Sequence, residues 1–266
     1  AAARSRAPGR PYLRPLVAAA APLAPPEVNL TVQASRFQDS FGAGVRAEAG
    51  GTGTLRATVD GNQFTNLPDL ALGVYQSSVS PVDAIVTGNA VDNSAAPFVY
   101  GGGFDFGQSA NGALRALVTG NTVQRTGFDG ISLFAFDYPV DGLSDGMHVT
   151  VQNNAVAGVE TGNGFFASTE STDNLICLDA SANSFSTTAP SSFGILVQQG
   201  FQGLTGTFQL SGMTPGPVTS VAVETYLDAT NLLVAPPTAA VGIAFTGVAP
   251  GTCALPGPTP LPPSTP

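Results

Sequence analysis

The sequence predicts an all-β fold, a right-handed parallel β-helix of about six coils with a small C-terminal cap that contains one helix. Three observations lead to this prediction: a repeat of roughly thirty residues, short apolar strands within each repeat, and a composition rich in turn formers. Hydrophobic residues make up 43% of the 266-residue chain, and 32 glycines and 22 prolines provide for many turns. Such a composition favours short strands over long helices.

The repeat is an apolar strand that ends in Gly-Asn or a close variant and is followed by an apolar residue two positions later. The clearest copies are LRATVDGNQF (55–64), VDAIVTGNAV (82–91) and LRALVTGNTV (114–123). The looser copies are NLTVQASRF (29–37), MHVTVQNNAV (147–156) and ICLDASANSF (176–185). The asparagine position is held in turn by Ser35, Asn62, Asn89, Asn121, Asn154 and Asn183, and the apolar position by Phe37, Phe64, Val91, Val123, Val156 and Phe185.

Gly-Asn turns occur both in a meander of hairpins and in a parallel β-helix, and the length of the repeat distinguishes these two folds. Strands of a hairpin meander recur every 8–12 residues or so, whereas this signal recurs at steps of 27, 27, 32, 33 and 29. A coil of three short strands needs about that length. We therefore expect the asparagines to form a ladder at one corner, where the residue tolerates a left-handed backbone and its amide can bond the next coil. The apolar positions should point inward.

A second feature of most repeats is a glycine followed by an apolar strand. The examples are Gly44-Val45, Gly73-Val74, Gly130-Ile131, Gly164-Phe165 and Gly194-Ile195. The two long steps contain glycine- or aspartate-rich inserts, at 95–112 and 135–146, which we expect to protrude from one face. Inserts of this kind often mark the binding face of a repeat protein.

The regular repeat divides the chain into four parts. Residues 1–27 form a Pro/Ala-rich linker or targeting remnant, 28–200 the β-helix, 201–253 the cap and 254–266 a Pro-rich disordered tail. Within the cap, FQGLTGTFQLSG (201–212) is typical of a hairpin. The segment 220–231 predicts a helix with Val223, Tyr226 and Leu227 on one face.

The only two cysteines, Cys177 and Cys253, belong to no CxxC motif. They are expected either to form one disulfide between the last regular coil and the end of the cap, or to be two buried thiols.

The charge distribution argues against polyanionic partners. The net charge is −9, lysine is absent, and all nine arginines lie at or before Arg125. Nucleic acid and anionic membranes are therefore not expected as partners. Leu16–Ala24 is too short and too rich in proline for membrane insertion.

These repeats resemble the right-handed β-helix proteins of bacterial surfaces, which have the pectin-lyase-like fold. The resemblance covers 28 to about 200. It extends into the order ICLDASANSF, GILVQQG, TFQLSG, VAVETYLDATN and TCALP, which is similar to the C-terminal end of many secreted β-helix proteins. It implies a secreted or cell-surface, adhesin-like protein. Pectate lyases and polygalacturonases share the fold, but their Trp-containing, Asn-Thr-Asp, Gly-His-Gly and Arg-Ile-Lys signatures do not occur.

Several residues are candidates for a binding face on one side of the coils. The possible ligand face comprises Tyr100, Phe104, Asp105, Asp129 and Tyr138, with Phe134 and Phe136 as further rings on which a sugar could stack. Asp105 and Asp129 also lie on neighbouring coils, where two carboxylates could act as a catalytic pair on a glycoside. Turn aspartates beside core phenylalanines would give the same pattern.

A metal site is the remaining candidate. Asp137, Asp141 and Asp145 could surround a calcium ion on a glycine-bearing loop, although their spacing matches no known calcium motif and equally suits a solvated acidic turn. No other cofactor is expected. His148, the lone histidine, is expected to be a surface or edge residue.

Together these observations favour a non-catalytic extracellular module of structural or adhesive type, which displays loops to a surface protein or glycan. One alternative is a polysaccharide-acting enzyme, lyase or glycoside hydrolase, or a carbohydrate-binding β-helix. A second is a filament subunit that self-associates by coil-to-coil stacking.

Overall fold

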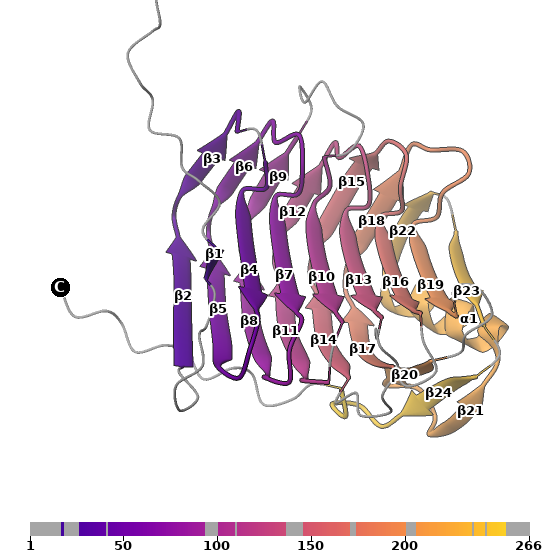
Figure 1. Ribbon diagram of the computed structural model, residues 1–266. Coiled ribbons are helices and arrows are strands. Elements are labelled where there is room, and N and C mark those ends of the chain that lie inside the picture. Colours follow the sequence, from indigo (N-terminus) through magenta and orange to yellow (C-terminus); the bar gives the residue numbers. More distant parts are fainter. Residues whose placement is uncertain are drawn as a thin grey trace, which may run out of the picture.

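The computed structural model shows the predicted right-handed parallel β-helix (Figure 1). It describes residues 17–18, 27–40, 42–93, 101–109, 111–136, 146–170, 174–200, 206–235, 237–242 and 244–253. Each coil contributes one strand to each of three sheets, which we call A, B and C.

The strands are stacked in the order of the coils. Sheet A contains β1 (Val17–Ala18), β4 (Val45–Ala49), β7 (Leu72–Gln76), β10 (Phe104–Gln108), β13 (Ile131–Ala135), β16 (Phe165–Thr169), β19 (Ile195–Gln199) and β23 (Thr238–Val241). Sheet B contains β2 (Glu27–Gln33), β5 (Thr54–Asp60), β8 (Val82–Thr87), β11 (Leu114–Thr119), β14 (Met147–Gln152), β17 (Leu175–Ser181), β20 (Thr207–Ser211), β24 (Phe245–Val248) and β21 (Gly216–Val218). Sheet C contains β3 (Arg36–Gln38), β6 (Gln63–Thr65), β9 (Ala90–Asp92), β12 (Thr122–Gln124), β15 (Ala155–Val159), β18 (Ser184–Thr187) and β22 (Leu232–Ala235).

The core consists of columns of like side chains, because the register repeats from coil to coil. In sheet B, Leu55, Val82, Leu114 and Met147 occupy equivalent positions and are buried. In sheet C the inward column runs through Phe37, Phe64, Val91, Val123, Val156 and Phe185 and continues to Leu233. Burying such a column removes each apolar side chain from water, worth about 1.5–3 kcal/mol per large residue.

The asparagines of the repeat stack at the corner between sheets B and C. The side chain of Asn121 illustrates the pattern: its Oδ1 accepts from both the backbone N–H (2.9 Å) and Nδ2 (3.0 Å) of Asn89. Its Nδ2 donates to the Val86 carbonyl and to Oδ1 of Asn154, both at 2.9 Å. The same bonds recur at Asn62, Asn89, Asn154 and Asn183. The asparagine amides thereby satisfy backbone groups that are buried from water at this corner.

The left-handed backbone at this corner belongs to the residue before each asparagine, and not to the asparagine as expected. Gly61, Gly88 and Gly120 have φ values of 64°, 60° and 66°. Asn153 and Ala182 adopt similar values in the looser copies. Glycine is preferred there because it has no Cβ to clash.

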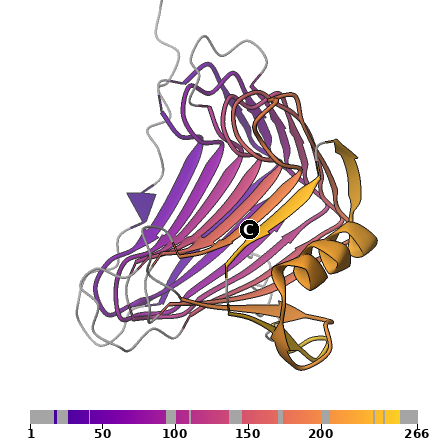
Figure 2. The same cartoon turned by 90° about the vertical axis from the view of Figure 1, so that its right-hand side faces the viewer.

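The coils continue past residue 200. Strand β20 pairs in parallel with β17, so the hairpin expected at 201–212 is wrong for its described part. The helix is present as α1 (Ser220–Thr230) and buries Val223 and Leu227, while Tyr226 is partly buried against the core. It lies at the C-terminal end of the stack (Figure 2). No helix of the described part is long and apolar enough to cross a membrane.

The ladder ends on this helix. Asn231 is the C-terminal cap of α1, and its Oδ1 accepts from the N–H (3.1 Å) and Nδ2 (2.8 Å) of Asn183. Its own Nδ2 donates to the carbonyl of Leu227 in the last turn of α1 at 3.0 Å. Asn231 therefore couples the helix to the column of coils.

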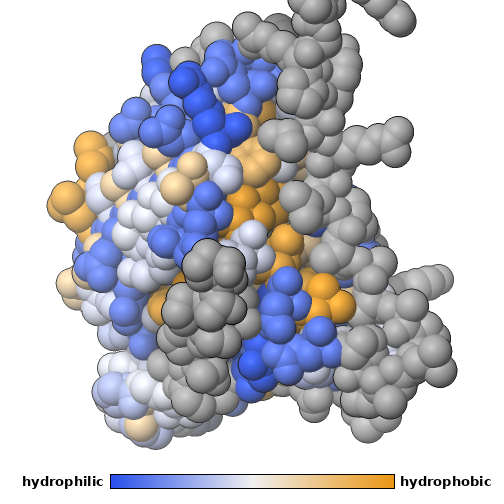
Figure 3. All heavy atoms as spheres, turned by 90° about the vertical axis from the view of Figure 1, so that its left-hand side faces the viewer, coloured by the Kyte–Doolittle hydropathy of each residue, from blue (hydrophilic) through white to orange (hydrophobic). Residues whose placement is uncertain are grey.

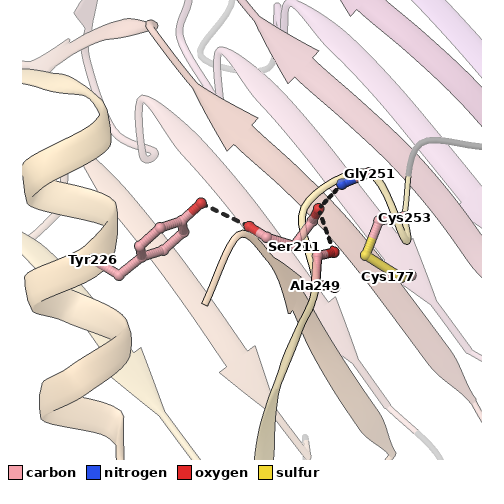
Figure 4. Close-up of a disulfide and its surroundings, with 6 residues drawn as sticks. All are labelled: Cys177, Ser211, Tyr226, Ala249, Gly251 and Cys253. Atoms are coloured by element: carbon pink, nitrogen blue, oxygen red, sulfur yellow. Dashed lines mark hydrogen bonds between the residues drawn. A yellow bond between two sulfur atoms is a disulfide. The ribbon is translucent and has the colours of Figure 1, made fainter. Parts of the chain in front are cut away.

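Cys177 and Cys253 form a disulfide that joins β17 to the segment after β24 (Figure 4). Both residues are buried. Nearby, the Tyr226 hydroxyl donates a hydrogen bond to the backbone carbonyl of Ser211 (2.6 Å), and the N–H of Gly251 donates to Oγ of Ser211 (3.0 Å). These contacts fasten the helix and the final turn to strand β20.

The first prediction concerns the ladder. Replacing Asn121 with alanine should lower the free energy of unfolding by roughly 3 kcal/mol or more, because buried groups of Asn89 and Val86 lose their partners. Urea unfolding followed by circular dichroism measures the change. Thr122→Ala is the matched control, since Ala90 and Ala155 occupy that position in the neighbouring coils. Equal stability of the two variants would contradict the role given to the ladder.

The second prediction concerns the disulfide, which closes a chain segment of 76 residues. The double variant Cys177→Ala/Cys253→Ala should be less stable by about 2–4 kcal/mol, because the unfolded chain regains conformational freedom. Thermal melts with and without reductant test this. Reductant should lower the melting temperature of the wild type and leave the variant unchanged. A wild type whose melting temperature does not change on full reduction would contradict the stabilising role of the disulfide.

Candidate functional site

The outward side of sheet A carries a group of polar and aromatic side chains that share one surface. We define the sheet A face as the outward residues of β4, β7, β10, β13 and β16. One row runs Arg46, Gly73, Asp105, Ser132 and Phe166, and the other Glu48, Tyr75, Gly107, Phe134 and Ser168. The residues adjacent to them in each strand, such as Ala47, Val74, Phe106 and Leu133, point into the core.

Tyr75 lies flat over two glycines in the middle of this face. A Cβ on Gly73 would be 2.6 Å from the ring, and one on Gly107 would be 2.8 Å from it. The Arg46 guanidinium stands over the ring, with Cζ at 4.7 Å from the centroid, and forms an ion pair with Glu48 at 3.1 Å. A cation over a tyrosine face is attracted by the ring's π electrons. The two glycines thus make the space that the ring fills.

Asp105 is held at the end of the Tyr75 ring by two hydroxyl groups. The Tyr75 hydroxyl donates to Oδ2 at 2.6 Å, and the Ser132 hydroxyl donates to Oδ1 at 2.7 Å. Burial raises the pKa of Asp105, and these two bonds oppose that rise. Burial, followed by the Asp105 charge, raises the pKa of Tyr75, so the phenol remains a donor. The result is a fixed chain of polar groups across three coils.

Aromatic rings continue the face beside this polar group. Phe134 and Phe166 pack edge to face, with centroids 5.1 Å apart. Phe136 leaves 40% of its surface exposed, and its ring comes within 4.0 Å of the position a Cβ on Gly107 would take. Phe128, just before β13, is 48% exposed. Exposed rings next to fixed hydrogen-bonding groups are the two components of a sugar-binding surface.

Asp129 has a different hydrogen-bond partner from Asp105. Its Oδ1 accepts from the N–H (2.6 Å) and Nδ2 (3.1 Å) of Asn163 in the next coil. Burial raises the pKa of Asp129, the bonds from Asn163 oppose that rise, and the Asp105 charge adds to it. The charge of Asp105 therefore acts on Asp129, while the hydrogen bonds described for the two carboxylates come from different donors.

The other residues of the predicted ligand face are Phe104, Tyr100 and Tyr138. Phe104 is fully buried and points into the core, so its assignment to a ligand face is wrong: it begins β10, where alternate residues face inward. Tyr100 and Tyr138 lie outside the described residues, as do Asp137, Asp141 and Asp145 of the predicted calcium site. Within the described ranges, no group of three or more His, Cys, Asp or Glu side chains is placed to hold a metal ion.

The sequence analysis did not identify Tyr75 as a residue of this face. It matched Gly73-Val74 with Gly44-Val45, which is two residues out of register. The structure pairs Val45 with Leu72, so Ala71, and not Gly73, precedes the strand of that coil. The equivalent glycine of the following coil is Gly103, which precedes Phe104. With this alignment, Tyr75 and Phe134 fall in one outward row, and the sequence would have indicated the face.

Sheet B carries a second polar row that the sequence analysis also missed. Arg56, Asp83, Arg115 and His148 are in register on its outward side. Asp83 is buried between two arginines, with Arg115 Nε at 2.5 Å and Arg56 Nε at 3.8 Å, and Arg56 also pairs with Glu27 at 3.1 Å. Each of these residues stands six before a ladder asparagine, which is a signal visible in the sequence. His148 lies inside this sheet, with strands on both sides.

Comparison with known proteins identifies the fold family and gives no closer relative. The family model for a right-handed β-helix region matches residues 26–204. No curated protein and no solved structure matches the chain. Because the match covers more than half of the chain and the structure has the same architecture, the protein belongs to the right-handed β-helix family.

Proposed function

We propose that this protein is a non-catalytic extracellular β-helix module of adhesion type, and that the sheet A face binds a glycan. The observation that carries the proposal is the placement of Phe134 and Phe136 beside the fixed group Tyr75–Asp105–Ser132. The coils hold this group rigidly, because each of its members stands on a paired strand or directly follows one.

The chemistry of the face suits a neutral sugar chain. The apolar C–H faces of a sugar ring pack on aromatic rings such as Phe134 and Phe136, and its hydroxyl groups need partners at the edge. Asp105 and Glu48 offer acceptors, and Arg46 offers donors. A glycan bound perpendicular to these strands would contact aromatic rings and hydrogen-bonding side chains on successive coils, which are spaced about 4.8 Å apart.

The contacts of the carboxylates support a binding role without turnover. Both oxygens of Asp105 accept hydroxyl groups of the protein, and Asp129 is bonded by Asn163. A general acid and base must reach the same scissile bond from opposite sides. These two side chains are instead each held by their own donors and directed to different coils.

Two further properties support the proposed location and the proposed kind of partner. The disulfide between Cys177 and Cys253 favours an oxidising compartment. The net charge of −9 and the absence of lysine disfavour nucleic acid and anionic membrane surfaces as partners.

The third prediction is that glycan binding depends on the half-buried ring of Phe134 and the exposed ring of Phe136. A glycan array should identify a ligand for the wild type, and the variants Phe134→Ala and Phe136→Ala should each bind it at least tenfold more weakly. Leu117→Ala is the matched control, because Leu117 is a large outward apolar residue of sheet B, and it should bind like the wild type. Retained binding in both phenylalanine variants would refute the assignment of the face.

A polysaccharide-acting enzyme is the second candidate, and one observation favours it: burial raises the pKa of both Asp105 and Asp129. A raised pKa is what a general acid needs near neutral pH.

The fourth prediction separates this candidate from the first. A polysaccharide-degradation screen of the wild type, Asp105→Asn and Asp129→Asn should show no turnover in any of the three proteins. Reducing-end and unsaturated-product assays cover hydrolysis and elimination. Turnover by the wild type that Asp129→Asn abolishes would replace the binding proposal with an enzymatic one.

A further inference from the structure

The N-terminal end of the stack has open strand edges in the described part of the chain. Strand β2 pairs only with β5, and β3 only with β6. The apolar column is also incompletely covered there: Val28 and Phe37 are half-buried, whereas their equivalents in the next coil, Leu55 and Phe64, are 1% exposed. Figure 3 shows the apolar surface at this end of the molecule.

The opposite end of sheet B differs from this one. In sheet B, the outer edge of β24 is covered by the antiparallel strand β21. Helix α1 lies at the same end (Figure 2), and the disulfide fixes the last turn. A second copy that added its β2 to this end of sheet B would therefore meet the short antiparallel strand β21, and not a parallel strand of the coils.

The backbone of β2 presents regular hydrogen-bonding groups at its free edge. The N–H of Ala34 donates to Asp60 in the next coil, and Nδ2 of Asn62 reaches back to the carbonyl of Val32. Alternate residues of a strand in a parallel ladder direct both backbone groups to the same side. The even-numbered residues of β2 therefore face β5, and Glu27, Asn29, Thr31 and Gln33 direct their N–H and C=O groups outward.

We propose that two copies of this chain form a head-to-head dimer by antiparallel pairing of β2 with β2 around Leu30. The sequence EVNLTVQ suits this arrangement because its apolar residues are symmetric about Leu30. Pairing around Leu30 sets Val28 opposite Val32 of the second copy, and Leu30 opposite Leu30, so the apolar columns of both copies meet. Asn29 and Thr31 become a hydrogen-bonded pair across the two-fold axis, and so do Glu27 and Gln33, because all four direct their backbone groups outward.

The charges of β2 agree with this register. Glu27 is the strand's only charged residue, and it faces the neutral amide of Gln33 in the second copy, not another carboxylate. An amide N–H is a suitable donor to a carboxylate across strands, whereas like charges directly opposite destabilise the pair. The two-fold arrangement uses the same surface on both copies, so it closes at two subunits and does not continue into a filament.

The fifth prediction tests this interface on the full chain by analytical ultracentrifugation over a concentration series. The wild type should show a monomer–dimer equilibrium. Thr31→Pro should weaken association at least tenfold, because it removes an outward N–H without touching a bond to β5. Thr31→Val, which keeps that N–H, is the matched control and should dimerise like the wild type. Circular dichroism and melting temperature establish that the proline variant is folded.

A second variant tests the register. Gln33→Glu should set a carboxylate opposite Glu27 of the second copy, weaken the dimer at low salt and lose part of that effect in 1 M salt. Three results would overturn the proposal: a wild type that stays monomeric at the highest concentration, a dimer that neither variant weakens, or species that grow beyond two subunits.

Discussion

The fold depends on satisfying the buried backbone where sheet B turns into sheet C. Each coil places a peptide N–H and a valine carbonyl at this corner, away from water, and an asparagine side chain bonds both. A buried polar group without a partner costs about 1–3 kcal/mol. Since every asparagine serves the coil before and the coil after its own, the corner fixes the vertical register of the strands. The flat sheet A face and the sheet B ion row depend on that register.

The sequence was informative where a residue type is required by the backbone. The Gly-Asn corner, the inward apolar column and the helix after residue 219 all have such a requirement, and so does the repeat length that excluded a hairpin meander. The last rung, Asn231, was missed because 48 residues separate it from Asn183, with α1 between them. The hairpin at 201–212 was wrong because its turn residues are compatible with both connections, and only the pairing of β20 with β17 distinguishes them.

The candidate site was less predictable, because it depends on register between coils of unequal length. Asp105 was singled out, but Tyr75, Arg46 and Ser132, which surround it, were not. Phe104 was placed on the same face as its neighbour Asp105, although adjacent residues of a strand point to opposite sides. The rigid frame then explains the proposed function: the coils hold rings and polar groups in fixed positions, which suits recognition of a repeating glycan. The open edge of β2 is a separate surface at one end, so association of two copies leaves the sheet A face of each available.

The most direct measurement of the central claim is native-state hydrogen exchange of the backbone N–H groups of Asn62, Asn89, Asn121 and Asn154, read by nuclear magnetic resonance. If side-chain amides hold this corner together, these protons exchange only when several coils open at once, as slowly as the buried strand amides of sheet B. Exchange at the rate of freely solvated turns, while sheet B remains protected, would show that the coils stack without the ladder.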